Sequence, residues 1–405
     1  MKSAYASLRT RSAKQFLIPI LGIGLVAGIF TTAMSSVSRA DPVSDFYKGK
    51  RLNILIGFGA GGGYDTTTRL VARHYGRHVP GRPTVVVQNM PGGGSLKVLN
   101  FLYNQPSLRD GATLGVFNSA AVLEPLYGNK KAQFEARKLS WIGSMHSDVQ
   151  ACAVWKGAGA GIKTLQDMIK SKKTVVFGST GPAAPTSLFP LFFKNALGAP
   201  IKVVTGYKGT KDVNLAMQRG EVDATCGMFE STVRGAFYND FKSGDLVMFV
   251  QVSMGLPVPD IFAKATPVTA LLTTPELKKA AQLVFGPSAL TRPLSAAPGV
   301  PKDRVAALRK ALLDAMKDPA MIADGKKIKV TFSPIAGDQV EKMIEEFYAT
   351  PTDVVKKAYA YTHTPRGGPC RDAVPRAAPY ESVPCRSRCS DQSLRLAGAG
   401  PDIGF

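Results

Sequence analysis

The sequence predicts an α/β protein, and its pattern and its length both indicate this. Short β-like runs alternate with amphipathic helical segments between Asp41 and Pro365, as in βαβ units that build a largely parallel sheet. After removal of an expected 40-residue leader, 365 residues remain, which is enough for two domains of about 150 residues each. The apolar fraction of 45% is typical of a globular protein.

Each expected element follows from a local pattern. Strands are expected at five apolar runs rich in β-branched residues, at 52–56, 84–87, 112–117, 174–177 and 202–204. Cap spacing predicts helix starts at Thr164 with Asp167 and at Asp338 with Glu341. Pro301 suits the first turn of a helix whose apolar face carries Val305, Leu308, Leu312 and Met316.

The first forty residues have the pattern of a secretory signal peptide. Basic residues precede an apolar run at 16–30, and Ser38 and Ala40 are the small residues that a signal peptidase reads. A membrane span needs roughly 20 apolar residues, and this run is shorter and is interrupted by glycines. We therefore expect cleavage after Ala40 and export to the periplasm.

The charge of the chain favours anionic partners. The formal net charge is +22, and loss of the leader with its five basic residues leaves +17. A basic surface attracts small acids, nucleic acids or lipid headgroups. We exclude nucleic acid because the basic residues are spread along the chain, without a Lys/Arg run or an interleaved aromatic motif.

The five cysteines do not form a disulfide framework, since their number is odd. Cys152 and Cys226 lie mid-chain, and the other three lie in the tail from residue 366 onward. A bond between Cys152 and Cys226 and two buried thiols both fit the sequence. The tail is rich in Pro, Arg and Cys without any periodicity, so we interpret residues 366–405 as a disordered or out-of-frame extension that the fold does not need.

Two glycine-rich loops follow expected strands and open expected helices. The first, residues 57–65, contains the candidate binding residues Gly61, Gly62, Gly63 and Asp65. It satisfies G-x-G-x-x-G literally, but the next strand ends in Gln88 and Asn89 and offers no acid for a ribose hydroxyl. No Gly-Lys-Ser/Thr is present either, so we reject dinucleotide and nucleoside triphosphate sites.

The second loop, residues 89–95, contributes the candidates Gly92, Gly93, Gly94 and Ser95. Glycines let a ligand approach the backbone closely, and a helix N-terminus offers free N–H groups and a positive dipole end. Adjacent parallel strands bring such loops to the same sheet edge. We therefore predict a carboxylate between residues 61–63 and 92–95, although the glycines could also serve only as tight turns. Asp65 is expected to cap the helix that follows it.

The remaining candidates lie further along the chain. The segment 178–186 combines hydroxyls and a glycine between a strand and a helix, and 206–210 does the same around an aromatic residue and a lysine. The hydroxyls of 179–186 are expected to close over the ligand. These candidate binding residues are Ser119, Ser179, Thr180, Gly181, Thr186, Tyr207 and Lys208.

An ordered set of motifs resembles one family. Gly-Gly-Gly-Tyr-Asp at 61–65 and Val-Val-Val-Gln-Asn-Met-Pro-Gly-Gly-Gly at 85–94 come first. The set continues with Asp-Gly-Ala-Thr-Leu at 110–114, Gly-Tyr-Lys-Gly at 206–209, Gly-Glu-Val-Asp-Ala at 220–224 and Ala-Pro-Gly-Val-Pro at 297–301. Together they resemble the substrate-binding receptors of tripartite tricarboxylate transporters, from about Phe46 to Tyr361.

The resemblance implies a type II periplasmic-binding fold, with two α/β lobes and a ligand cleft between them. Residues 41–147 and 265–365 would form the first lobe, with the chain returning through a strand-like run at 281–285 and the segment 294–300. Residues 148–264 would form the second lobe. The family implies a monomer that delivers a small carboxylate to integral membrane transporter subunits, without a metal or a cofactor.

The chain departs from the family at two places that bear on the ligand. Phe58, Gly59 and Ala60 stand where members commonly have a proline, and residues 88–90 replace the usual acidic and basic neighbours of the second loop. The ligand class therefore stays open among di- or tricarboxylates, aromatic acids and acidic amino acids. A ligand-sensing protein of the same fold, feeding a signalling partner, is the main alternative function.

The sequence does not support an enzyme. His74 and His78 have the i, i+4 spacing of metal ligands, but no third ligand is evident. Ser119 and Ser179 lack the G-x-S-x-G context of a hydrolase nucleophile. His146 and His363 have no acidic partner visible in the sequence. An exported hydrolase is accordingly the weakest alternative.

Overall fold

The computed structural model describes residues 41–157, 161–330 and 332–363. The expected signal peptide and the tail from residue 366 lie outside the described residues, so the predictions for both stand as made. No helix in the described ranges is long and apolar enough to cross a membrane.

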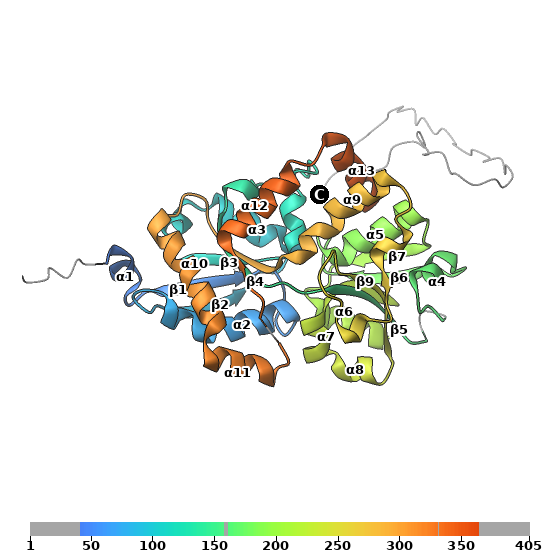
Figure 1. The fold of residues 1–405 in the computed structure, drawn as a ribbon, viewed down its shortest axis with the longest axis horizontal. Helices are drawn as coiled ribbons and strands as arrows, with labels where there is room; N and C mark the ends of the chain where they lie inside the picture. Colours follow the sequence, from blue (N-terminus) through green and yellow to red (C-terminus); the bar gives the residue numbers. More distant parts are fainter. Residues whose placement is uncertain (1–40, 158–160, 331, 364–405) are drawn as a thin grey trace, which may run out of the picture. The chain divides into compact units, whose positions relative to one another are not determined.

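The first sheet has six strands in the order β12-β4-β11-β3-β1-β2. Strands β1 to β4 are labelled in Figure 1. Strand β1 pairs in parallel with β2 and β3, while β11 runs antiparallel between β3 and β4. The strands are β1 (Arg51–Ile56), β2 (Thr84–Asn89), β3 (Thr113–Val116), β4 (Ser140–His146), β11 (Thr291–Ala296) and β12 (Ile335–Ala336). The helices associated with this sheet are α2 (Gly63–Tyr75), α3 (Leu96–Asn104), α10 (Lys302–Lys317), α11 (Pro319–Lys327) and α12 (Gly337–Tyr348). We call this sheet with its helices the first lobe; α1 (Pro42–Tyr47) precedes it in the chain.

The second sheet has the order β10-β9-β5-β8-β6-β7 and, with its helices, forms the second lobe. Strands β6, β7 and β8 are parallel, and β5 is antiparallel to β8 and β9. The strands are β5 (Gln150–Trp155), β6 (Val175–Ser179), β7 (Ile201–Thr205), β8 (Ala224–Phe229), β9 (Leu246–Val252) and β10 (Thr266–Pro267). Its helices are α4 (Leu165–Lys170), α5 (Pro185–Leu197), α6 (Thr210–Gln218), α7 (Glu230–Ala236), α8 (Tyr238–Lys242), α9 (Pro275–Phe285) and α13 (Thr352–Thr362).

Short 3₁₀ helices connect several of these elements. Among the described residues they are η1 (Gly76–His78), η2 (Gly93–Ser95), η3 (Pro106–Asp110), η4 (Ser119–Leu123), η5 (Ala136–Lys138), η6 (Asp260–Phe262), η7 (Val268–Leu271) and η8 (Gly286–Ala289). Two of them matter for the site, because η2 forms the second glycine loop and η4 carries Ser119.

The described chain crosses between the lobes three times. It passes from β4 to β5 at residues 147–149, from α9 to β11 at 286–290, and from α12 to α13 at 349–351. The first lobe is therefore discontinuous. The chain returns to the first lobe at residues 286–290, later than the boundary that we expected after residue 264. The segment in between belongs to the second lobe, because β10 pairs with β9 and α9 packs on α5. Helix α13 also packs on α5 and α9, so the end of the described chain belongs with the second lobe.

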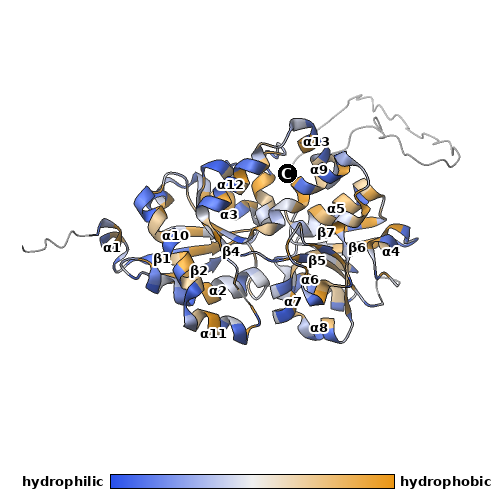
Figure 2. Ribbon diagram, viewed as in Figure 1, coloured by the Kyte–Doolittle hydropathy of each residue, from blue (hydrophilic) through white to orange (hydrophobic). Residues whose placement is uncertain are grey.

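Apolar faces hold the elements together as the sequence patterns predicted. Leu308, Leu312 and Met316 of α10 are buried in the core of the first lobe, with Val305 packed against it. Helix α5 buries most of its residues, and Figure 2 shows both this helix and β1 largely in the hydrophobic colour. Thr164 and Asp167 form the predicted reciprocal cap of α4.

Some local predictions were wrong. The run 281–285 forms the end of helix α9 instead of a strand, since a short apolar run does not distinguish the two. Helix α12 begins at Gly337, and Gln339, not Glu341, bonds back to the cap position. Helix α2 begins at Gly63, inside the segment 57–65 that we expected to be a loop.

The two mid-chain cysteines form a disulfide, which resolves the alternatives that the sequence left open. Cys152 of β5 and Cys226 of β8 are bonded, with 74 residues of sequence separation. Both residues are fully buried in the centre of the second sheet. The bond therefore joins two adjacent strands of the second lobe.

Candidate functional site

The first glycine loop leads from β1 into α2 without a side-chain cap. Gly62 is the N-cap residue, and no side chain at this position caps the helix. The first N–H groups of the helix are therefore left without a capping acceptor. Asp65 does not cap the following turn as we expected. Its carboxylate accepts instead from the Gly61 N–H (2.9 Å), from Arg69 Nε (2.9 Å) and from Asn89 Nδ2 (2.9 Å). It thereby pins the loop to the end of β2.

The second glycine loop has a backbone that only glycine adopts easily. Gly92, Gly93 and Gly94 have φ values of 150°, 61° and 67°, in the range where other residues are strained. Asn118 holds the loop from β3, since its Nδ2 donates to the Gly94 carbonyl and its N–H donates to Ser95 Oγ (3.2 Å). Ser95 and Ser119 are both buried, and Ser95 is committed to these internal contacts.

The hydroxyls of the second lobe bond mainly to one another. Thr186 Oγ1 lies 2.9 Å from Ser179 Oγ and 3.1 Å from Thr180 Oγ1, and it accepts from the Thr180 N–H at 3.0 Å. Ser179 Oγ also lies 2.6 Å from Ser187 Oγ. The predicted hydroxyls are thus gathered at one place, where they brace the turn between β6 and α5.

The loops of the two lobes contact each other through backbone. The Gly59 N–H donates to the Lys208 carbonyl at 2.7 Å. A Cβ atom added at Gly94 would lie 2.8 Å from the Ala184 nitrogen, and one added at Gly181 would lie 2.3 Å from the Gly94 nitrogen. Such short separations leave no room for a side chain, so glycine is needed at both positions of this contact.

The first loop also approaches α6, where it faces side chains. A Cβ at Gly62 would lie 3.3 Å from Thr210 Oγ1, and one at Gly61 would lie 3.3 Å from Lys211. Lys208 contributes its carbonyl to the contact and Tyr207 is partly buried beside it, where burial raises the pKa of the Tyr207 phenol. Each glycine loop of the first lobe therefore contacts one of the candidate segments of the second lobe, and Asp65 and Ser95 hold these loops through hydrogen bonds inside the first lobe. The predicted carboxylate position between 61–63 and 92–95 stays a prediction.

Sequence reasoning missed a buried arginine at the same boundary. Arg292 of β11 is fully buried with a φ of 60°. Its Nε donates to the Gly63 carbonyl (3.1 Å), and its Nη2 donates to Ser231 Oγ (3.0 Å) and Thr232 Oγ1 (3.3 Å) of α7. The guanidinium also lies over the rings of Phe229 (4.9 Å) and Tyr64 (5.7 Å). It therefore links the first turn of α2 to the second lobe.

Asp148 is the nearest compensating charge. It accepts from Ser231 Oγ (2.6 Å) and from the N–H groups of Glu230 (3.1 Å) and Ser231 (3.1 Å). Burial raises the pKa of the Asp148 carboxyl, and the charge of Arg292 opposes that rise. Ser231 consequently bridges a buried cation and a buried carboxylate.

Two histidines have acidic neighbours that we did not expect. His146 Nε2 lies 3.8 Å from Asp148 Oδ2, and His363 Nε2 lies 3.6 Å from Glu124 Oε1. Burial, and secondarily Arg292, lowers the pKa of His146 to about 3, so this ring is neutral near pH 7. His146 and Asp148 are two residues apart, so the sequence itself offered a signal for this pair. His363 and Glu124 are far apart in the sequence, and only the fold brings them together.

The pair His74 and His78 has a structural role. His74 Nε2 lies 3.0 Å from Asp324 and His78 Nε2 lies 2.8 Å from Asp318, so the two rings tie α2 and η1 to α11. Across residues 41–157, 161–330 and 332–363, no group of three or more His, Cys, Asp or Glu side chains could hold a metal ion.

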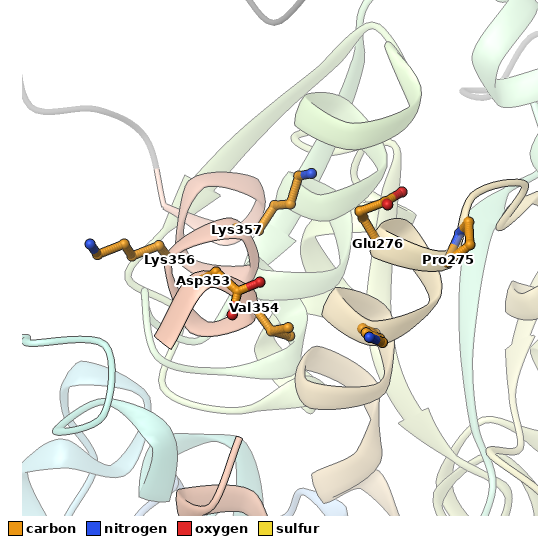
Figure 3. Close-up of a pocket in the computed structure, with 7 residues that line it drawn as sticks. Pro275, Glu276, Asp353, Val354, Lys356 and Lys357 are labelled. Atoms are coloured by element: carbon orange, nitrogen blue, oxygen red, sulfur yellow. The ribbon is translucent and has the colours of Figure 1, made fainter. Parts of the chain in front are cut away.

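Two hollows differ in their position relative to the glycine loops. One, of about 530 Å³, lies between the starts of α9 and α13 (Figure 3), away from the glycine loops. Its lining residues, mostly charged, are Pro275, Glu276, Lys279, Asp353, Val354, Lys356 and Lys357. The other, of about 370 Å³, is bordered by Gly63, Thr66, Thr232, Arg292 and Lys329. Only the second adjoins the boundary between the lobes.

Comparison with known proteins supports the resemblance seen in the motifs. No family-wide sequence profile matches the chain. The chain is 27% identical over 223 residues to the UPF0065 protein in the TAR-I ttuE-ttuC' intergenic region of Agrobacterium vitis. The match covers 54% of this chain and 62% of that relative, which is less than two thirds of its length.

Two solved structures share the fold. The periplasmic binding protein BugD is 18% identical, with a TM-score of 0.60 over 77% of this chain and 98% of BugD. MatC from Rhodopseudomonas palustris, solved with bound malate, is 16% identical, with a TM-score of 0.57 over 75% of this chain and 99% of MatC. The two-lobed α/β fold of periplasmic binding proteins, predicted from the motifs, is confirmed.

Proposed function

We propose that this chain is an extracytoplasmic solute-binding receptor that holds a small carboxylate between its lobes and passes it to a membrane transporter. One observation carries the proposal most directly: the glycine loops of the first lobe meet the loop at 181–184 and the Lys208 carbonyl of the second lobe through backbone contacts. Loops that touch without side chains leave their N–H groups close to any ligand enclosed there.

The start of α2 suits the ligand carboxylate. In the described chain the N–H groups of Gly62 and Gly63 have no hydrogen-bond acceptor. They point from the positive end of a 13-residue helix, where a carboxylate gains charge-assisted hydrogen bonds. The basic sequence, with a net charge of +22, would raise the rate at which anions arrive.

The known relatives direct the choice of ligand and partner. MatC was solved with malate, so C4 dicarboxylates are the first acids to test. Delivery to a transporter rests on the resemblance to tripartite transporter receptors, and a non-enzymatic role fits solute-binding neighbours such as BugD.

A binding screen tests the proposal. Melting temperatures would be measured with di- and tricarboxylates, aromatic acids and acidic amino acids at fixed pH and salt, followed by calorimetry on each acid that stabilises the protein. A ligand present at 100 times its Kd should add about 2.7 kcal/mol of stability. Failure of every acid to bind would overturn the proposed function.

Gly62→Val tests the location of the carboxylate. Gly62 has a φ of −82°, which valine tolerates, so the substitution should block the ligand without straining the backbone. Loss of one hydrogen bond to a carboxylate corresponds to about 1.5–3 kcal/mol of binding free energy. Thr210→Ala is the matched control, because Thr210 Oγ1 is the atom that the new side chain would meet. If Gly62→Val binds normally, or if adding Thr210→Ala restores binding, the carboxylate does not lie at this loop.

A further inference from the structure

A third hollow, of about 830 Å³, lies between the turn after η4 in the first lobe and the elements α5 and β7 of the second. In the described parts of the chain it shares no bordering residue with the two hollows described above. Its volume falls within the range of about 300–1,000 Å³ that is usual for small-molecule sites. The hollow is therefore large enough for a ligand of its own.

Four lysines border this hollow, two from each lobe. Lys130 and Lys131 lie in the turn after η4, Lys194 lies in α5 and Lys202 lies in β7. All four are exposed, and none forms a salt bridge with a described residue. Unpaired cations around one hollow attract anions, and several of them together favour an anion that carries more than one charge.

Glu124 is the one acidic residue among the described residues that border the hollow, and it does not neutralise the lysines. Its side chain is 1% exposed, with Oε2 accepting from Asn129 Nδ2 at 2.5 Å and Oε1 lying 3.6 Å from His363 Nε2. Asn129 Oδ1 accepts in turn from the Lys131 N–H at 3.0 Å. The carboxylate thus shapes the turn that carries the first-lobe lysines, and the lysines outnumber it by four to one.

Both pairs of lysines are attached to helices that start at the contact between the lobes. Asn100 of α3 donates to the Lys131 carbonyl (2.8 Å) and accepts from the Gln133 N–H (2.8 Å), which fixes the turn to α3. Helix α3 follows the second glycine loop, and α5, which packs on β7, follows the turn at 181–184 that approaches Gly94. An anion held by both pairs would therefore tie together the two helices whose starts meet at Gly94.

We propose that the hollow bordered by Lys130, Lys131, Lys194 and Lys202 is a second ligand site, which takes a small anion with two or more negative charges and stabilises the contact between the lobes. Lysines on opposite lobes repel each other, and an anion between them replaces this repulsion by attraction. Its oxygens accept charge-assisted hydrogen bonds from the ammonium groups. The exposed hydroxyl of Thr205, which also borders the hollow, adds a neutral donor. Polycarboxylates and phosphorylated compounds share this chemistry, and the inference does not depend on a carboxylate site at the glycine loops.

Calorimetry on the full-length protein with pyrophosphate and, separately, with citrate tests the site. We expect at least one of these anions to bind and acetate, at the same ionic strength, not to bind at the hollow. The double variant Lys194→Gln, Lys202→Gln should weaken that binding about tenfold or more, because it removes charge-assisted hydrogen bonds to the anion. The anion that loses more affinity in this variant indicates whether phosphate or carboxylate groups suit the hollow better.

The double variant Lys163→Gln, Lys242→Gln is the matched control. Both lysines are exposed in the second lobe and lie outside the hollow, so the control removes the same charge from the same lobe. It should bind both anions as the unmodified protein does. If neither anion binds, or if neither loses affinity selectively in Lys194→Gln, Lys202→Gln, the proposal is overturned.

The stabilisation of the lobe contact is tested with any acid that the binding screen identifies. Saturating pyrophosphate should tighten the binding of that acid about fivefold or more, as a coupling between two sites does. This effect should disappear in Lys130→Gln, Lys131→Gln. An unchanged or weakened affinity for the acid in the unmodified protein would overturn the coupling. If no acid binds, the proposed function fails, and the calorimetry with pyrophosphate and citrate alone decides whether the hollow is a ligand site.

Discussion

Replacing Arg292 by methionine should destabilise the protein chiefly by leaving Asp148 without its compensating charge. The guanidinium makes three hydrogen bonds, and Ser231 connects it to the Asp148 carboxylate. Removing one member of a buried charge pair typically costs about 3–5 kcal/mol, because the other charge stays buried and uncompensated. Methionine retains much of the apolar volume, so the cavity contributes little. We expect a loss of roughly 3–5 kcal/mol at pH 7–8.

The stability that Arg292→Met loses relative to the wild type should be smaller at lower pH. The pKa of Asp148 is already raised by burial, and Arg292 is what opposes the rise. Without Arg292 the pKa of Asp148 in the folded variant rises further above its value in the unfolded chain. Protonation of Asp148 therefore favours the folded variant at acid pH, and this stabilisation is lost as the pH rises through the folded-state pKa. His146 acts in the same direction, because removal of Arg292 relieves part of the depression of its pKa.

Urea unfolding of the wild type and the variant at pH 5 and pH 8 measures the effect. The difference between their unfolding free energies should be smaller at pH 5. In the double variant Arg292→Met, Asp148→Asn the carboxyl is gone, so the difference should depend much less on pH and should be smaller at pH 8. A difference that is equal at both pH values in the single variant would refute the coupling between Arg292 and Asp148.

Three further outcomes follow from the fold. Thr164→Ala should cost about 1 kcal/mol through loss of the α4 cap, and Thr164→Ser should cost little in the same urea titration. Replacing Cys152 and Cys226 together by alanine should lower stability by about 4 kcal/mol, because the bond closes a long loop, and reduction of the wild type should give a similar loss. Gly181→Ala should keep the second glycine loop away from the turn at 181–184, since its Cβ would meet the Gly94 nitrogen. An unchanged radius of gyration in X-ray scattering, with ligand affinity also unchanged, would contradict this.

Local patterns were enough to predict much of the fold. The strand runs at 52–56 and 84–87 each became a strand followed by glycines, because β-branched residues favour a buried strand and glycines favour the turn that must follow. The apolar spacing from Val305 to Met316 likewise became one helix, α10, with its apolar face in the core. In these cases the residues that determine the structure are near neighbours in the chain.

The errors arose where distant residues decide the outcome. Asp65 has the position and chemistry of a helix cap, yet Asn89 and Arg69 draw its carboxylate back to the loop. The run 281–285 is an exception, because nearby residues decide it: it is the end of a helix that starts at Pro275 after the cap residue Thr274. Arg292 has no local motif at all, because its partners Gly63 and Ser231 come from elements 229 and 61 residues away. Only the fold brings such groups together.

The three crossings restrict how the protein can move mechanically. Residues 147–149, 286–290 and 349–351 each bind one lobe covalently to the other. Any movement of one lobe against the other must be one that all three connecting segments permit at once, which favours rotation about a narrow set of hinge axes. Asp148 belongs to the connector 147–149, and Arg292 lies in β11, two residues after the connector 286–290 ends. A buried charge therefore stiffens the connectors between the lobes, and the force needed to separate the lobes should depend on the protonation of a single buried carboxyl.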